Sequence, residues 1–142
     1  MRVVFFGTPK IAASILEALL RAKVDVVAVI TQAPKRCGRG QSVKSSPVAT
    51  IARERKIPLL EPEKASAPEF IERIAKFKPE LAIVVAYGKI LTQVLLDIPT
   101  LGCINVHASL LPKYRGAAPM QRALMAGDKK TGITIMKMVR AL

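Results

Sequence analysis

Polar side chains that could act on a substrate recur at every second position near residue 105. Asn105, His107 and Ser109 follow one another with this spacing, in a row that Cys103 begins. Because successive side chains of a strand point to opposite faces, we expect this row to project to one side. In open α/β sheets, ligands bind beyond the carboxyl ends of the strands. The spacing therefore predicts a site at the end of this strand.

Asn105 and His107 together suit acyl transfer to an amine. An amide N–H and a titratable imidazole are two convergent donors for the oxyanion of a tetrahedral intermediate. His107 is the only histidine, and neither a metal site nor a Cys or Ser nucleophile with a base at a recognised spacing is indicated. The only acid after Asp97 is Asp128, in a Gly-Asp-Lys-Lys turn, which we expect to be solvated, so the orienting carboxylate is missing. A structural role for the pair stays open.

Short β-branched runs alternate with helical stretches along the chain. The runs are mostly apolar without alternation, which is typical of parallel strands covered on both faces. We therefore predict an α/β fold with an open, mostly parallel, Rossmann-like sheet and right-handed crossovers. The predicted strands are residues 3–6, 26–31, 58–60, 81–86, 103–107 and 133–138, and the predicted helices are residues 11–21, 48–56, 68–77, 92–96 and 118–126.

The first turn reads Gly7-Thr8-Pro9 at the end of the first predicted strand. Thr8 is expected to cap the following helix and Pro9 to occupy its first position. A Gly-x-Gly-x-x-Gly pattern does not occur at this turn, which excludes a dinucleotide cofactor there.

The composition is that of a folded domain. Of the 142 residues, 51% are hydrophobic and 23% are charged, which is unlike a disordered chain. No apolar run approaches the length of a membrane span, and the first residues do not have the layout of a signal peptide. We expect a soluble, cytoplasmic protein.

The net charge of +13 is concentrated in two segments. Residues 34–56 and residues 113–140 each hold seven basic residues and one acid, so each carries +6 and the rest of the chain carries +1. This pattern indicates a surface for a polyanion such as a phosphate backbone, with two solvated segments as the alternative. Residues 32–47 are too long for an ordinary connection, and we expect an exposed, mobile, basic loop that becomes ordered on a partner; a tolerated insertion is the alternative.

Around Asn105 and His107, and in the basic loop, the sequence resembles the methionyl-tRNA formyltransferases. These folate-dependent enzymes move a formyl group from 10-formyltetrahydrofolate to the amino group of initiator methionyl-tRNA. Asn-x-His followed by Ser-Leu-Leu-Pro is shared across folate-dependent formyltransferases, whereas the basic loop and residues 115–122 point to the tRNA enzymes. The resemblance covers essentially the whole chain, and its matching segments are residues 6–9, 31–32, 38–40, 46–48, 85–91, 105–121 and 132–136.

The resemblance also implies roles for particular residues. Asn105 and His107 would be catalytic, and no metal would take part. The loop of residues 35–44 would contact the acceptor end of tRNA through Lys35, Arg36, Arg39 and Lys44. Arg39 would be the main contact. The formyl donor would contact Ser109, Leu110, Leu111 and Pro112, with Tyr87, Gly88, Ile90 and Leu91 near its pterin.

The sequence departs from the family pattern at both ends. Lys10 and Ile11 stand where the family commonly has an acid and phenylalanine, with little bearing on catalysis. Family members continue past residues 132–136 into an Asp-x-Gly turn with a catalytic aspartate and then a C-terminal barrel that binds tRNA. We therefore expect residues 1–142 to be an incomplete N-terminal domain without the barrel, with little or no activity alone. Full-length relatives would be monomers, whereas an exposed sheet edge here would favour self-association.

Two other functions are compatible with the same residues. A formyltransferase acting on a small amine, such as a nucleotide sugar or glycinamide ribonucleotide, would use Asn105 and His107 but would not need the basic loop. A non-catalytic RNA-binding module would need the charge, with Asn105 and His107 as structural residues.

Overall fold

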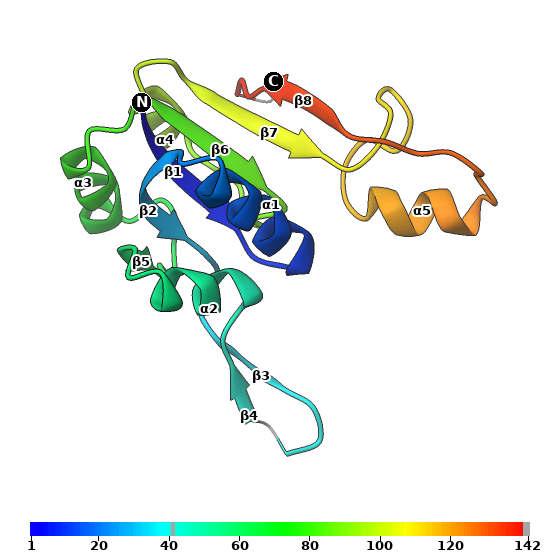
Figure 1. Ribbon diagram of the computed structural model, residues 1–142, viewed down its shortest axis with the longest axis horizontal. Helices are drawn as coiled ribbons and strands as arrows, with labels where there is room; N and C mark the ends of the chain where they lie inside the picture. Colours follow the sequence, from blue (N-terminus) through cyan, green and yellow to red (C-terminus); the bar gives the residue numbers. More distant parts are fainter. Residues whose placement is uncertain (41, 141–142) are drawn as a thin grey trace.

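The centre of the molecule is a six-stranded sheet in the order β5-β2-β1-β6-β7-β8 (Figure 1). The computed structural model describes residues 1–40 and 42–140. All neighbouring strands are parallel except β8, which runs antiparallel to β7, so the predicted open, mostly parallel α/β sheet is confirmed. The strands are β1 (Arg2–Gly7), β2 (Asp25–Ile30), β5 (Leu59–Leu60), β6 (Leu81–Val85), β7 (Cys103–His107) and β8 (Thr134–Lys137).

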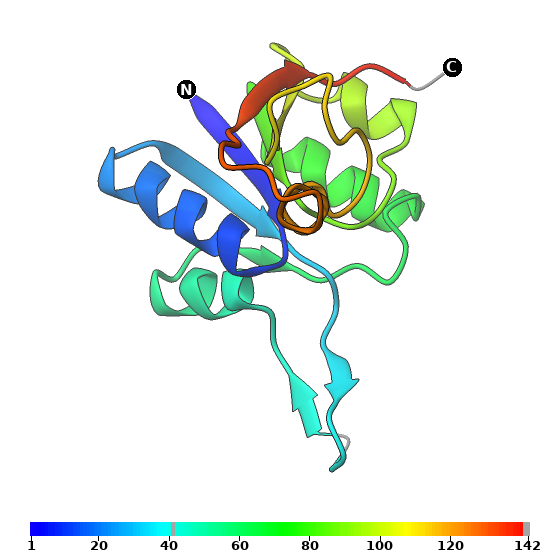
Figure 2. The same ribbon diagram turned by 90° about the vertical axis from the view of Figure 1, so that its right-hand side faces the viewer.

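Helices cover both faces of the sheet. Val3 and Phe5 of β1 pack on one face against the first two helices, whereas Val4 and Phe6 pack on the other against the next two. Both faces of β1 are therefore in the core, which explains its unbroken apolar sequence. The fifth helix lies beyond the end of β7 (Figure 2). The helices are α1 (Lys10–Arg21), α2 (Pro47–Glu54), α3 (Pro68–Lys76), α4 (Gln93–Asp97) and α5 (Pro119–Met125).

The predicted cap at Thr8 is wrong. Helix α1 begins after Pro9, which is the N-cap residue in an extended conformation with ψ 179° and no side-chain cap. The Thr8 hydroxyl donates to the backbone oxygen of Tyr87 over 3.1 Å and lies 3.4 Å from the backbone nitrogen of Gln32. Thr8 thus ties together the chain segments that follow β1, β2 and β6 instead of capping the helix.

Residues 32–47 contain a small antiparallel hairpin of β3 (Lys35–Cys37) and β4 (Ser42–Lys44). It extends away from the body of the molecule (Figures 1 and 2). Residues 34–36, 38–40 and 42–45 of this segment are exposed, as expected. The two strands were not predicted because Lys-Arg-Cys and Ser-Val-Lys are too short and too polar to show a strand pattern. Gln41 lies outside the described residues.

Replacing Gly7 by alanine is expected to destabilise the fold. An added Cβ would lie 2.7 Å from the Ala12 Cβ, 2.8 Å from Phe5 Cε1 and 3.0 Å from the backbone oxygen of Val85. Such overpacking costs about 1–3 kcal/mol of unfolding free energy, or about 2–4 °C in Tm per kcal/mol for a chain of this size. Thermal unfolding measures the change. Gly40→Ala, where a Cβ would meet nothing within 4 Å, is the matched control, and equal Tm values for the two variants would contradict the prediction.

Candidate active site

Asn105 and His107 lie where strand β7 ends. Asn105 is in register with Val84 of β6 and with Met136 of β8, and His107 is in register with Thr134 of β8. Both polar side chains are half-buried and line the same two cavities. They therefore project to one side of the strand, as the spacing predicts.

The larger cavity has a volume of about 710 Å³ and lies between the end of β6 and α5. Asn105, His107 and Gly116 border it on the β7 side. Volumes in this range are typical of small-molecule sites. The remaining wall is made by residues 9–11, 84–89, 106, 108, 117–121 and 138.

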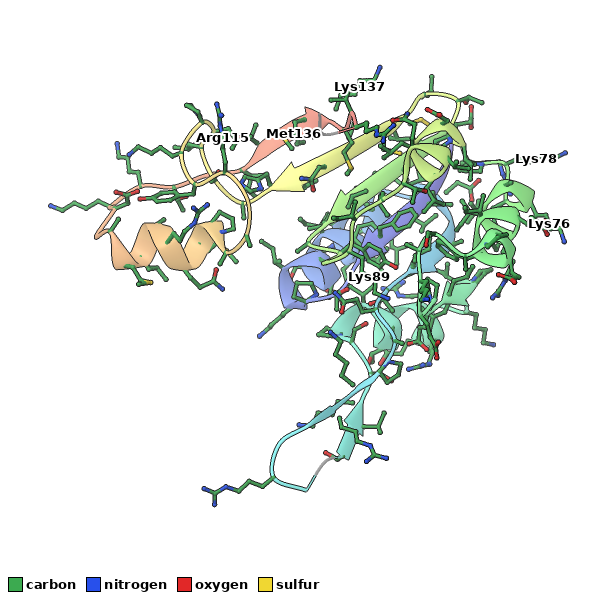
Figure 3. All side chains as sticks on the ribbon, turned by 180° about the vertical axis from the view of Figure 1, so that it is seen from behind. Lys76, Lys78, Lys89, Arg115, Met136 and Lys137 are labelled. Carbon is green, nitrogen blue, oxygen red and sulfur yellow. The ribbon has the colours of Figure 1, made fainter. Side chains whose placement is uncertain are left out.

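The smaller cavity, of about 630 Å³, lies on the β8 side of the same three residues. Its apolar lining comes from Leu111, Pro112 and Met136, and its charge comes from Arg115. Figure 3 shows Arg115 and Met136 beside each other at this end of the sheet. Because the two cavities share Asn105 and His107, two reactants in adjoining spaces could reach the same pair of side chains.

His107 has a defined hydrogen-bond partner. Its Nε2 lies 2.8 Å from the backbone oxygen of Tyr114. A carbonyl oxygen can only accept, so Nε2 carries a hydrogen and donates it. In the neutral ring, Nδ1 is therefore the nitrogen that can take up a proton.

The expectation that Asp128 is solvated is wrong. Its side chain is 22% exposed, and the Tyr114 hydroxyl donates to its carboxylate over 2.6 Å. This hydrogen bond is the main cause that raises the pKa of the Tyr114 hydroxyl, which therefore stays protonated at neutral pH. Tyr114 precedes Asp128 by fourteen residues, and only the folding of the loop onto the end of α5 brings the two together.

Ser109 and Thr134 hold the turn that follows β7. Ser109 is fully buried, and its hydroxyl donates to the backbone oxygen of Lys113 over 2.7 Å. The Thr134 hydroxyl donates to the backbone oxygen of Ser109 over 2.7 Å and accepts from the backbone N–H of Leu111 over 3.2 Å. Thr134 was not predicted as a site residue, and the signal that could have indicated it is a hydroxyl within the apolar run of residues 133–136.

The eight residues that the resemblance assigns to the formyl donor are divided in the structure. Leu111 and Pro112 line the smaller cavity, and Tyr87 and Gly88 line the larger one. The other four line neither of the two: Ser109 and Leu91 are buried, Leu110 borders a separate cavity of about 350 Å³ beside Tyr114 and Asp128, and Ile90 is 92% exposed.

Cys103 does not share the exposure of Asn105 and His107. Its thiol is buried in the core, 3.7 Å from the backbone oxygen of Leu96. Burial, together with the nearby Asp97 carboxylate, raises the pKa of this thiol to about 11, so it is protonated and unreactive at neutral pH. Among the side chains that the structure describes, no group of three or more His, Cys, Asp or Glu could hold a metal ion.

The hairpin carries all four residues that the resemblance assigns to tRNA. Lys35 and Arg36 lie on β3, Arg39 in the turn and Lys44 on β4, and all four are exposed. The hairpin follows β2, which is parallel to β1, β6 and β7. It therefore leaves the sheet at the carboxyl ends of these strands, where Asn105 and His107 also lie.

None of the helices in the described ranges is long and apolar enough to cross a membrane.

Comparison with known proteins identifies close relatives of the sequence. The chain is 53% identical over its whole length to a methionyl-tRNA formyltransferase of Pseudomonas savastanoi pv. phaseolicola and covers 45% of that protein. It is 49% identical over its whole length to a methionyl-tRNA formyltransferase of Thermotoga sp. (strain RQ2), again covering 45% of it. The chain thus spans less than half the length of these curated relatives.

Solved structures show the same fold at lower identity. A phosphoribosylglycinamide formyltransferase from Bacillus halodurans matches with a TM-score of 0.78 at 20% identity, over 99% of this chain and 73% of that one. A sugar N-formyltransferase from Shewanella matches with a TM-score of 0.60 at 19% identity, over 97% of this chain and 51% of that one. The sequence matches the formyl transferase family over residues 1–142. On this match and this fold, the chain belongs to the formyl transferase family.

Proposed function

We propose that this chain supplies the catalytic residues of a methionyl-tRNA formyltransferase. The reaction would transfer a formyl group from 10-formyltetrahydrofolate to the amino group of initiator methionyl-tRNA. The observation that carries the proposal is the position of Asn105 and His107 where two cavities of about 630 and 710 Å³ meet. The methionyl-tRNA formyltransferases that are 53% and 49% identical in sequence to this chain support methionyl-tRNA as the substrate.

The two adjoining cavities suit a formyl donor that extends across both, with an amine beside it in the larger one. Leu111 and Pro112 form an apolar surface for a flat heterocycle, with Arg115 beside it for an anionic group. Tyr87 and Gly88 flank the same pair of polar residues from the opposite side. A donor that contacts both sets would pass over Asn105 and His107, which leaves the wall formed by residues 117–121 for the aminoacyl end.

Asn105 and His107 would divide the chemical work between them. The donor supplies a formyl carbon that bears a nitrogen leaving group. The Asn105 amide would donate to the formyl oxygen as negative charge develops there, and His107 Nδ1 would take the proton that the attacking amine loses. The new C–N bond forms to the amine, the old one breaks, and the proton passes to the departing nitrogen.

The hairpin would bind the phosphate backbone of tRNA. Lys35 of β3 lies opposite Lys44 of β4 in the register, so the two strands present basic side chains side by side. A polyanion placed against the hairpin would contact several of these charges and release counterions. We infer that the basic hairpin is the part of this chain that distinguishes tRNA from a small amine.

Replacing Arg39 by glutamine is expected to weaken tRNA binding in a salt-dependent way. Loss of one phosphate contact lowers the slope of log K against log salt by about 0.7–0.9. Titration of labelled tRNA at several salt concentrations measures it. Lys76→Gln, an exposed charge removed from α3 outside the hairpin (Figure 3), is the matched control. If both variants change the slope equally, the hairpin has no special role.

The activity itself is tested in a chimera. The chain would replace the matching part of the Pseudomonas relative, and formylation of methionyl-tRNA would be compared with that by the chain alone. The chimera is expected to formylate methionyl-tRNA and not glycinamide ribonucleotide or an amino sugar nucleotide. Transfer to a small amine instead would favour a formyltransferase that acts on small amines, whereas tRNA binding without folate binding would favour an RNA-binding module.

We also propose that residues 1–142 belong to the N-terminal formyltransferase domain of a monomeric protein. Its location would be the cytoplasm, where initiator tRNA is found.

A further inference from the structure

We propose that Tyr114 and Asp128 are positioning residues that fix His107 with its hydrogen on Nε2 and its lone pair on Nδ1. The inference rests on the proposed function for its meaning, since it specifies which nitrogen would receive the proton. Its geometric basis is independent of any substrate. It consists of a connected set of contacts from the carboxylate of Asp128 to the imidazole of His107.

The last contact of this set decides the tautomer. The Tyr114 backbone oxygen can only accept a hydrogen bond, and His107 Nε2 lies 2.8 Å from it, so Nε2 must donate. The tautomer therefore depends on where the Tyr114 carbonyl points. If that carbonyl turned away, the hydrogen bond that favours the hydrogen on Nε2 of the neutral ring would be lost.

The Tyr114 carbonyl is held in a costly backbone conformation. Tyr114 has a φ of 55°, in the left-handed region that residues with a Cβ rarely occupy. Such a conformation persists only where surrounding contacts maintain it. Around Tyr114 these contacts include the Ser109 hydroxyl, which donates to the backbone oxygen of Lys113, and those of the Tyr114 side chain itself.

Two groups hold that side chain. The carboxylate of Asp128 accepts from the hydroxyl over 2.6 Å, and the Arg122 guanidinium lies 5.5 Å from the ring centroid. Arg122 also donates to the backbone oxygen of Arg115, the next residue along the loop. Asp128 is itself anchored, because its backbone N–H donates to the backbone oxygen of Ala123 in α5 over 3.0 Å. The end of α5 thus holds the loop that directs His107.

The single histidine makes the tautomer measurable in this chain without an activity assay. ¹⁵N NMR of the imidazole, at a pH high enough for a neutral ring, distinguishes a protonated nitrogen from an unprotonated one. The wild-type chain is expected to show one dominant tautomer with the hydrogen on Nε2. Tyr114→Phe and Asp128→Ala are expected to produce a mixture, seen as the two nitrogen shifts moving toward each other.

Two further variants make the test specific. Asp128→Asn keeps a side-chain oxygen that can accept from Tyr114, so it is expected to restore the dominant tautomer. Tyr87→Phe is the matched control, since it removes the other tyrosine hydroxyl, which is buried and has no hydrogen-bond partner among the residues described. A wild-type spectrum with the hydrogen on Nδ1, or spectra of Tyr114→Phe and Asp128→Ala that equal the wild type, would overturn the proposal. Failure of the chimera to formylate tRNA would overturn the proposed function and leave this result unaffected.

Discussion

Replacing Asn105 by alanine is expected to lower kcat for formyl transfer in the chimera by about 100- to 1,000-fold, the usual loss for one oxyanion donor. The amide lines both cavities and is in register with β6 and with β8, so the sheet fixes its backbone on both sides. A donor held in this way needs no reorganisation when charge develops on the formyl oxygen. Because that charge is present mainly in the transition state, KM should change little.

Steady-state kinetics with methionyl-tRNA and the formyl donor measure this effect. Gln93→Ala is the matched control, since it also removes an amide side chain, which on α4 is exposed and bonded to Asp97. Asn105→Asp keeps the volume but replaces the donor with a negative charge, and it should be at least as damaging. A rise in KM with kcat unchanged would assign Asn105 to ground-state binding instead.

The central strands of the sheet could be predicted because they are covered on both faces. Runs such as residues 3–6 and 81–86 must be apolar throughout when helices pack on either side, and this leaves a clear pattern in the sequence. The hairpin left no such pattern, since the side chains of Lys35, Arg36 and residues 42–44 are all exposed. At Thr8, the rule for helix caps was overridden by contacts with the segments after β2 and β6, which no local rule includes.

The candidate site could be predicted only where its geometry is local. Asn105 and His107 are related by the period of a single strand, so their common side follows from spacing. The other contacts of the site join residues far apart in the sequence. Tyr114 and Asp128 are 14 residues apart, and Thr134 and Ser109 are 25 residues apart. Turn composition around Asp128 indicates solvent exposure, whereas the fold supplies a tyrosine hydroxyl that the sequence does not place there.

Replacing His107 by alanine is expected to lower kcat for formyl transfer by about 100- to 10,000-fold, the range for loss of a general acid–base group. The ring is half-buried beside both cavities, and Nε2 donates to the Tyr114 backbone oxygen over 2.8 Å, which leaves Nδ1 for the proton of the amine. Binding of a folate analogue to the chain, measured by titration, should persist because the apolar surface of Leu111 and Pro112 remains.

The double variant Asn105→Ala/His107→Ala tests whether the two residues serve one step. Groups that act as a unit in the same transition state have strongly non-additive effects, so the double variant should be little slower than the His107→Ala single variant. Single-turnover rates in the chimera are the measurement, because they exclude product release. If the two losses multiplied, Asn105 and His107 would act in separate steps, and a shared role at the formyl carbon would be ruled out. A multiplied loss is not expected, because both side chains face the same two cavities from one side of β7.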